Sequence, residues 1–137
     1  MASRVLVIDQ SQELLDLYQL ILHAEGYEVL LASFVFQNMV DLELLHPDLI
    51  LLDYPWNSHE DEDLLLHLLK IYPPTASLPV LLSTTDEQIL YDREEVLPVQ
   101  SVSVMLKPFE IDDLLYLVQL ALAKEPAKKL KQAISLN

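Results

Sequence analysis

The stretch RVLVIDQ, residues 4–10, decides the fold of this chain together with its counterpart DLILLDYP, residues 48–55. Each is a short apolar run that ends in an aspartate, which is Asp9 in the first run and Asp53 in the second. The apolar residues follow one another without alternation, which is typical of strands buried on both faces of a parallel sheet. We therefore predict two parallel strands, 4–8 and 49–52, that each lead into a carboxylate.

The rest of the chain repeats this unit, because strand-like runs alternate with segments of helical periodicity. Further strands are predicted at 79–83 and 102–106, with a weaker one at 28–32. Leu14 to Leu22 form an apolar stripe with spacings of three and four, which Ser11 can cap and Gly26 can end. The other predicted helices are residues 36–45, 61–71, 87–97 (weakly defined) and 111–123. Five β-α repeats predict an α/β fold, a doubly wound five-stranded parallel sheet with helices on both faces.

The length and the charge distribution predict one acidic domain with a basic tail. The chain has 137 residues, the size of one domain. Residues 1–123 carry 21 acidic and 4 basic side chains, a formal charge of −17, whereas 124–137 carry four lysines and one acid, a charge of +3. We predict a domain at 1–123 and a tail at 124–137. The overall charge of −14 works against nucleic-acid binding, because phosphates attract the opposite sign.

Several functional classes are excluded by residues that the sequence lacks. There is no cysteine, so disulfides and thiolate metal sites are excluded. Gly26 is the only glycine, which excludes glycine-rich phosphate loops. No Gly-x-Ser-x-Gly motif occurs, which argues against an α/β-hydrolase. The apolar run at residues 5–8 is too short for a signal peptide, and no run is long enough to span a membrane. We expect a cytoplasmic protein that acts away from the membrane.

Polar side chains follow four of the predicted strands at the point where each strand ends. Asp9-Gln10 follow the first strand, Asp53 the third, Ser83-Thr84-Thr85 the fourth and Lys107-Pro108 the fifth. In open α/β sheets, ligands bind beyond the carboxyl ends of the strands. We therefore predict that two carboxylates, a hydroxyl and a lysine meet at one edge of the sheet.

In order and spacing, the stretches RVLVIDQSQELL, DLILLDYP, LPVLLSTT and VMLKPF resemble the receiver domain of two-component response regulators, over residues 3–123. The resemblance implies a flavodoxin-like fold. It also implies that Asp53 accepts a phosphoryl group from a histidine kinase or phosphotransfer protein. Lys107 matches the lysine that pairs with the acceptor, and Thr84 matches the hydroxyl that binds the phosphate. Asp9 and the backbone carbonyl of Pro55 match groups that face Mg²⁺ in the family.

This sequence departs from the family pattern at several of these positions. Gln10 replaces the second acid of the usual pair, which leaves a formal pocket charge of −1 instead of −2. Because Mg²⁺ sites depend on carboxylates, we expect weaker Mg²⁺ binding and slower phosphorylation, with Asp9, Asp53, Gln10 and the Pro55 carbonyl as the metal ligands. Val104 stands where the family has an aromatic residue, and residues 54–63 contain no glycine.

Each of these residues also has a purely structural interpretation. Asp53 and Lys107 could form a structural ion pair, Asp9 could cap the first helix, and Thr84 could be an ordinary strand-end hydroxyl. We interpret His59 and the acids at 60–63 as a solvated charge run at a helix start, not as a metal site. Trp56 could contact a partner or pack within its loop.

Two functions remain open on this evidence. The first is a single-domain response-regulator receiver, a phosphoacceptor in phosphorelay signalling. It would act through a downstream protein partner and would not be a conventional enzyme. The second is a degenerate receiver that works as a phosphorylation-independent interaction or dimerisation module. Gln10 and Val104 favour the second function, whereas Asp53, Thr84 and Lys107 favour the first. A homodimer is compatible with both functions.

Overall fold

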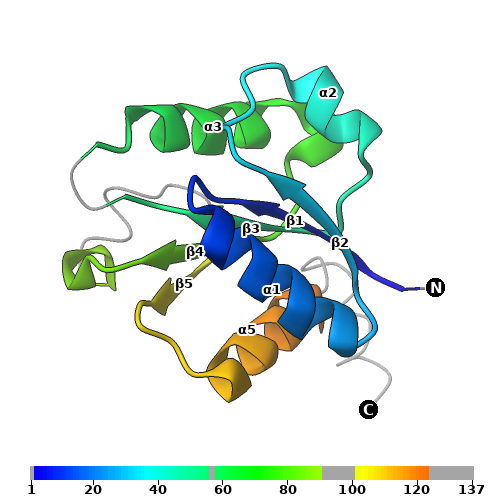
Figure 1. The fold of residues 1–137 in the computed structure, drawn as a ribbon. Helices are drawn as coiled ribbons and strands as arrows, with labels where there is room; N and C mark the ends of the chain where they lie inside the picture. Colours follow the sequence, from blue (N-terminus) through cyan, green and yellow to red (C-terminus); the bar gives the residue numbers. More distant parts are fainter. Residues whose placement is uncertain (1, 56–57, 91–100, 124–137) are drawn as a thin grey trace, which may run out of the picture.

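The computed structural model describes residues 2–55, 58–90 and 101–123, and its centre is a five-stranded sheet. All the strand pairs are parallel, and the strand order is β2-β1-β3-β4-β5 (Figure 1). This topology confirms the predicted doubly wound sheet. The strands are β1 (Arg4–Ile8), β2 (Glu28–Ala32), β3 (Leu49–Asp53), β4 (Val80–Thr84) and β5 (Val102–Leu106).

Helices cover both faces of the sheet and enclose two apolar cores. The helices are α1 (Gln12–Ala24), α2 (Met39–Leu44), α3 (Glu60–Ile71) and α5 (Ile111–Ala123), with short 3-10 turns η1 (Pro73–Thr75) and η2 (Glu87–Leu90). Helices α1 and α5 pack on one face, and α2 and α3 pack on the other (Figure 1). In the described part of the chain, no helix is long and apolar enough to span a membrane.

The ends of α1 are the ones that its sequence predicts. The Ser11 hydroxyl accepts a hydrogen bond from the Leu14 amide at 3.3 Å, so Ser11 is the N-cap. Gly26 has a φ of 91°, a left-handed conformation that suits glycine, and its amide donates to the His23 carbonyl at 3.0 Å. The Tyr27 amide donates to the Leu22 carbonyl at 3.1 Å, which completes a Schellman motif.

Two of the predicted helices differ from the structure. Helix α2 begins at Met39, three residues later than predicted, because the Asn38 side chain accepts from the Val40 amide at 3.0 Å and caps the helix there. Phe36, predicted as the first helical residue, instead packs from an irregular segment against the core under α2 and α3. Of the weak helix predicted at 87–97, the structure describes only the 3-10 turn η2, and residues 91–100 lie outside the described part.

Candidate functional site

Strand alternation decides which side chains meet at the carboxyl edge of the sheet. Successive residues of a strand point to opposite faces. On β3, Leu51 belongs to the core under α1 and α5 and Leu52 to the core under α2 and α3. Asp53, the next residue, therefore lies on the α1–α5 side. By the same alternation, Asp9 after β1 and Lys107 after β5 lie on that side as well.

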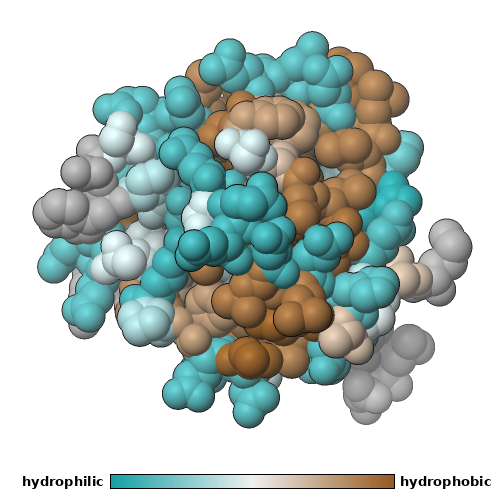
Figure 2. All heavy atoms as spheres, in the orientation of Figure 1, coloured by the Kyte–Doolittle hydropathy of each residue, from teal (hydrophilic) through white to brown (hydrophobic). Residues whose placement is uncertain are grey.

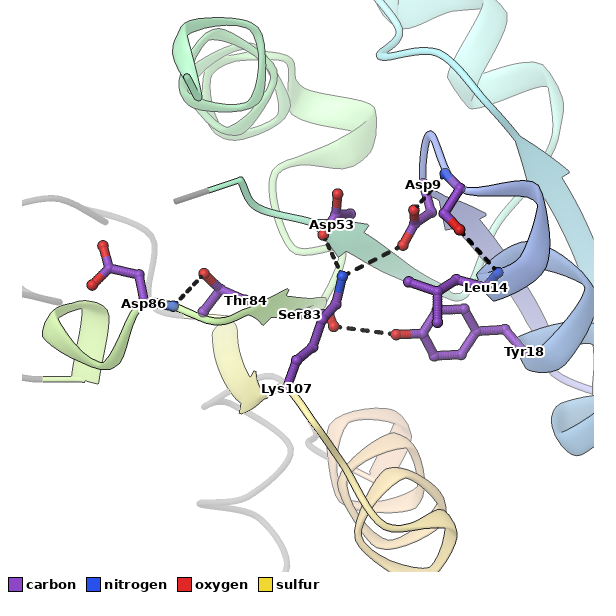
Figure 3. A network of polar contacts seen from close by, with 9 residues as sticks. Asp9, Leu14, Tyr18, Asp53, Ser83, Thr84, Asp86 and Lys107 are labelled. Atoms are coloured by element: carbon purple, nitrogen blue, oxygen red, sulfur yellow. Dashed lines mark hydrogen bonds and ion pairs between the residues drawn. The ribbon is translucent and has the colours of Figure 1, made fainter. Parts of the chain in front are cut away.

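The structure brings Asp9, Asp53 and Lys107 into one polar cluster, as the sequence predicts (Figure 3). Lys107 Nζ donates to Asp53 Oδ1 at 2.6 Å and lies 3.8 Å from Asp9 Oδ2. Asp9 is buried, with 3% of its surface exposed, whereas Asp53 is half-buried and opens to solvent. The single positive charge of Lys107 thus faces two carboxylates, and it lies closer to the more exposed one, Asp53.

Asp9 has one satisfied and one unsatisfied carboxylate oxygen. Its Oδ1 accepts from the Ser11 amide at 2.8 Å. Its Oδ2 is buried and has no hydrogen-bond partner among the described residues. Burial raises the pKa of Asp9, the bond from Ser11 opposes that rise, the charge of Asp53 adds to it, and Lys107 lowers the pKa again. Since Ser11 is the N-cap of α1, Asp9 is not the helix cap, which was one of its two interpretations.

Thr84 lies at the same edge but faces the other side of the sheet. It ends β4 one residue after Ser83, and Ser83 pairs with Asp53 in register. The Thr84 hydroxyl is buried and accepts from the Asp86 amide at 3.1 Å, away from Lys107 (Figure 3). The phosphate-binding role of Thr84 stays a prediction, and it requires the hydroxyl to leave Asp86.

The oxygen donors at this edge fit a hard cation in part. Among the residues that the structure describes, no group of three or more His, Cys, Asp or Glu side chains is placed to hold a metal ion. The donors present are the carboxylates of Asp9 and Asp53, the Pro55 carbonyl and the exposed amide of Gln10. The buried Oδ2 of Asp9, which has no hydrogen-bond partner among the described residues, is the observation that fits a cation such as Mg²⁺, which prefers carboxylate oxygens and water. Mg²⁺ therefore stays a prediction.

A network around Tyr54, the residue directly after Asp53, was missed by the sequence interpretation. The Tyr54 hydroxyl donates to Asp63 and lies 3.0 Å from His59 Nδ1, and the two rings stack at 4.6 Å. His59 Nδ1 lies 2.8 Å from Asp63 Oδ2. Tyr54 is buried, so these contacts tie β3 to the first turn of α3.

The prediction of a solvated charge run at residues 59–63 was therefore wrong for part of that run. His59 and Asp63 are half-buried in the Tyr54 network, and Glu62 is only 5% exposed. Burial is the main cause that raises the pKa of Glu62. The available signal was the spacing of four between His59 and Asp63, which places them on one side of a helical turn. Trp56 lies outside the described residues.

An apolar hollow of about 690 Å³ lies away from this polar cluster, beside the edge strand β2. Its lining includes Leu30, Phe34 and Phe36, with Asp41 at its rim. Figure 2 shows apolar side chains gathered over this part of the surface, from α2 toward β2. None of the predicted site residues lines the hollow, and the candidate chemistry lies at the polar edge of the sheet.

Comparison with known proteins identifies the fold. No family model matches the sequence, and no curated protein matches it. The chemotaxis protein CheY4 of Vibrio cholerae has a TM-score of 0.75 to this chain at 21% identity, covering 88% of this chain and 99% of its own. A CheY-like response regulator receiver domain protein of Methanospirillum hungatei has a TM-score of 0.71 at 24% identity, covering 89% and 94%.

A longer protein shares the same fold over nearly all of this chain. NtrX of Brucella abortus has a TM-score of 0.73 at 28% identity, and the match covers 98% of this chain but 29% of NtrX. Together these similarities show that the chain has the flavodoxin-like fold of CheY-like receiver domains, which confirms the fold that the sequence resemblance implied.

Proposed function

We propose that this chain is a receiver domain of two-component signalling in which Asp53 accepts a phosphoryl group from a histidine kinase or phosphotransfer protein. The observation that carries the proposal is the contact between Lys107 Nζ and Asp53 Oδ1 at 2.6 Å, with Asp9 beside it. The receiver fold of the chain supports the same function. Such a domain acts in the cytoplasm through protein partners and is not a conventional enzyme.

The chemistry requires a carboxylate nucleophile in a site that neutralises charge. A carboxylate oxygen of Asp53 attacks the phosphorus of a phosphohistidine, and the bond from phosphorus to the imidazole nitrogen breaks. The electron pair of that bond stays on the imidazole, which takes up a proton. Lys107 offsets the negative charge that gathers on the phosphoryl oxygens. Asp53 is the accessible member of its carboxylate pair, which suits it to meet a bulky donor.

A divalent cation, when bound, supplies further positive charge to the same oxygens. Asp9, Asp53, the Pro55 carbonyl and Gln10 would hold it. The charge of Asp53 raises the pKa of Asp9, so Asp9 ionises less readily while Asp53 is charged. Gln10 adds an oxygen but no charge, and it is exposed. We therefore propose weak Mg²⁺ binding and slow phosphorylation.

The test is phosphorylation of the full chain by a small phosphodonor, acetyl phosphate, across millimolar Mg²⁺, with intact-mass readout. We expect one phosphoryl group to be added to the wild-type chain and none to Asp53→Asn. Asp41→Asn is the matched control, because Asp41 is an exposed aspartate on α2 and should not affect the reaction. Absence of an Asp53-dependent mass gain at every Mg²⁺ concentration would overturn the proposal.

A second candidate function is a phosphorylation-independent interaction or dimerisation module. Two observations favour it: Gln10 contributes no charge, and the Thr84 hydroxyl is engaged by the Asp86 amide. The two functions differ in their response to the phosphodonor. If the chain dimerises or binds a downstream partner to the same extent with and without acetyl phosphate, as measured by light scattering or calorimetry, the second function is favoured.

A further inference from the structure

A pair of buried hydroxyl groups lies beside the acceptor, inside an otherwise apolar core. The hydroxyl oxygen of Tyr18 on α1 lies 3.1 Å from Ser83 Oγ on β4. Both side chains are fully buried, with 0% of their surface exposed. The other buried members of this core, under α1 and α5, are aliphatic residues and methionine. The pair therefore places two polar groups where apolar side chains would pack at lower cost.

The strand register places this pair next to Asp53. Ser83 pairs with Asp53 across β3 and β4, and paired residues of neighbouring strands point to the same face. Ser83 therefore lies on the α1–α5 side with Asp53, whereas Thr84 faces the α2–α3 side. Figure 3 shows the Ser83–Tyr18 contact alongside the Lys107 side chain. The β4 hydroxyl on the acceptor's side of the sheet is thus Ser83.

The charges of Asp9 and Asp53 also act on the Tyr18 hydroxyl. Burial raises the pKa of Tyr18 to about 12, the bond to Ser83 opposes that rise, and the charges of Asp9 and Asp53 add to it. Charges act over longer distances inside a protein than in water, because the interior screens them less. A change of charge at Asp53 therefore changes the field in which the Tyr18 and Ser83 hydroxyl protons are oriented. Either oxygen can be the donor of their bond, so the field from Asp53 can favour one direction of the bond over the other.

Tyr18 extends this pair to a third element. Its ring stacks on Phe109 with ring centres 5.4 Å apart and planes 13° apart. Phe109 follows Lys107-Pro108 in the connection from β5 to α5. Tyr18 therefore connects three elements, because it belongs to α1, bonds to β4 and stacks on the residue that leads into α5.

We propose that the Tyr18–Ser83 pair links the charge at Asp53 to the position of Phe109 and the start of α5. In this role Tyr18 and Ser83 are positioning residues. The physiological input, a phosphoryl group on Asp53, rests on the proposed function. The link itself needs only a change of charge at Asp53, and Asp53→Asn supplies such a change without phosphorylation.

The experiment measures the aromatic NMR resonances of Phe109 in the full chain with ¹³C-labelled phenylalanine. The change caused by Asp53→Asn is recorded in the wild-type background and in the Tyr18→Phe/Ser83→Ala background. The double variant keeps the ring that stacks on Phe109 and removes both hydroxyls together, so neither is left unpaired. Tyr72→Phe is the control, because it removes the hydroxyl of a half-buried tyrosine that bonds to Glu43 on the other face of the sheet.

We expect Asp53→Asn to shift the Phe109 resonances in the wild-type and Tyr72→Phe backgrounds, and at least half of that shift to be lost in the double variant. Asp53→Asn also breaks the Lys107 contact, and any shift that travels through Lys107-Pro108 alone is the same in all backgrounds. An equal shift in all backgrounds, or none in the wild type, would overturn the link. If the double variant does not fold, Tyr18→Phe alone replaces it with the same criteria.

The outcome is separate from that of the phosphorylation test. A chain that gains no phosphoryl mass but loses the Phe109 shift in the double variant keeps the link and fails the proposed function. A chain that is phosphorylated but shows equal Phe109 shifts in all backgrounds keeps the proposed function and fails the link.

Discussion

The Lys107–Asp53 contact should stabilise the fold measurably, and a double-mutant cycle tests this. The bond is 2.6 Å long, and the side chains are 18% and 23% exposed. Exposed ion pairs contribute about 0–1 kcal/mol, and hydrogen bonds to charged groups contribute about 1.5–3 kcal/mol. For a partly buried pair we expect a coupling energy of about 1.5 kcal/mol between Lys107→Met and Asp53→Asn, which is roughly a tenfold change in the folding equilibrium.

The single variant Lys107→Met should lower the free energy of unfolding by more than this coupling energy. Methionine keeps much of the apolar stem of lysine but carries no charge. The substitution therefore leaves Asp9 and Asp53 side by side without the cation that contacts both. We expect a loss of about 2 kcal/mol at pH 7, because a buried charge that loses its partner is costly. At roughly 4 °C per kcal/mol for a domain of this size, the melting temperature should fall by about 8 °C.

The loss should become smaller as the pH falls. Burial and Asp53 raise the pKa of Asp9 while Lys107 lowers it, so removing Lys107 raises it further. A carboxyl group with a raised pKa binds its proton more tightly in the folded state. Its contribution to stability is therefore largest below the unfolded-state pKa and is lost as the pH rises through the folded-state pKa. The deficit of Lys107→Met should accordingly narrow between pH 7 and about pH 4.

The assay is urea unfolding followed by circular dichroism, on the wild type, both single variants and the double variant, at both pH values. A single domain of this size is expected to unfold in one cooperative step. Additive effects within about 0.3 kcal/mol would show that Lys107 and Asp53 do not interact, and would refute the electrostatic account of the site. A deficit of Lys107→Met that grows at low pH would refute the role assigned to Asp9.

Three further substitutions test the same edge of the sheet. Asp9→Asn should raise the free energy of unfolding at pH 7 by about 1 kcal/mol, because it removes a buried charge. This gain should vanish at low pH, where the Asp9 carboxyl group is protonated in the wild type, and urea unfolding at several pH values measures it. Gln10→Asp should tighten Mg²⁺ binding about tenfold in calorimetric titration, and an unchanged affinity would contradict our account of the metal ligands. Tyr54→Phe should cost about 1 kcal/mol, because it leaves the half-buried His59 and Asp63 without the tyrosine hydroxyl; a thermal melt within error of the wild type would contradict this.

The strands and their polar ends were predictable because they depend on local signals. A continuous apolar run such as residues 49–52 indicates a buried parallel strand, and the parallel arrangement brings the carboxyl ends of all the strands to one edge. That rule brings Asp9, Asp53 and Lys107 to one edge, and the alternation of side chains along each strand puts all three on the same face. The caps of α1 were equally local, since Ser11 and Gly26 act on neighbouring amides and carbonyls.

The errors of the sequence interpretation occur where a distant contact competes with a local signal. Phe36 fits a helical pattern, but it packs against the core from the segment before α2, whose start Asn38 caps. The acids at 60–63 have the composition of an exposed run, but the hydroxyl of Tyr54 engages Asp63 and burial encloses Glu62. Tyr54 lies only nine residues before Asp63, but their contact, like the burial of Glu62, depends on how β3 and α3 pack together.

The sequence by itself determined the order of the strands along the chain and the identity of the strand-end residues. It also determined that Gln10 replaces one acid of the usual acidic pair. Those features depend on residue type and spacing, which need no partner. Only the tertiary structure decided how these residues are used. The register between β3 and β4 placed Ser83, and not Thr84, on the side of Asp53, and the packing of α1 brought Tyr18 to that serine. Side-chain facing depends on register to a single residue, because neighbouring strand positions point to opposite faces.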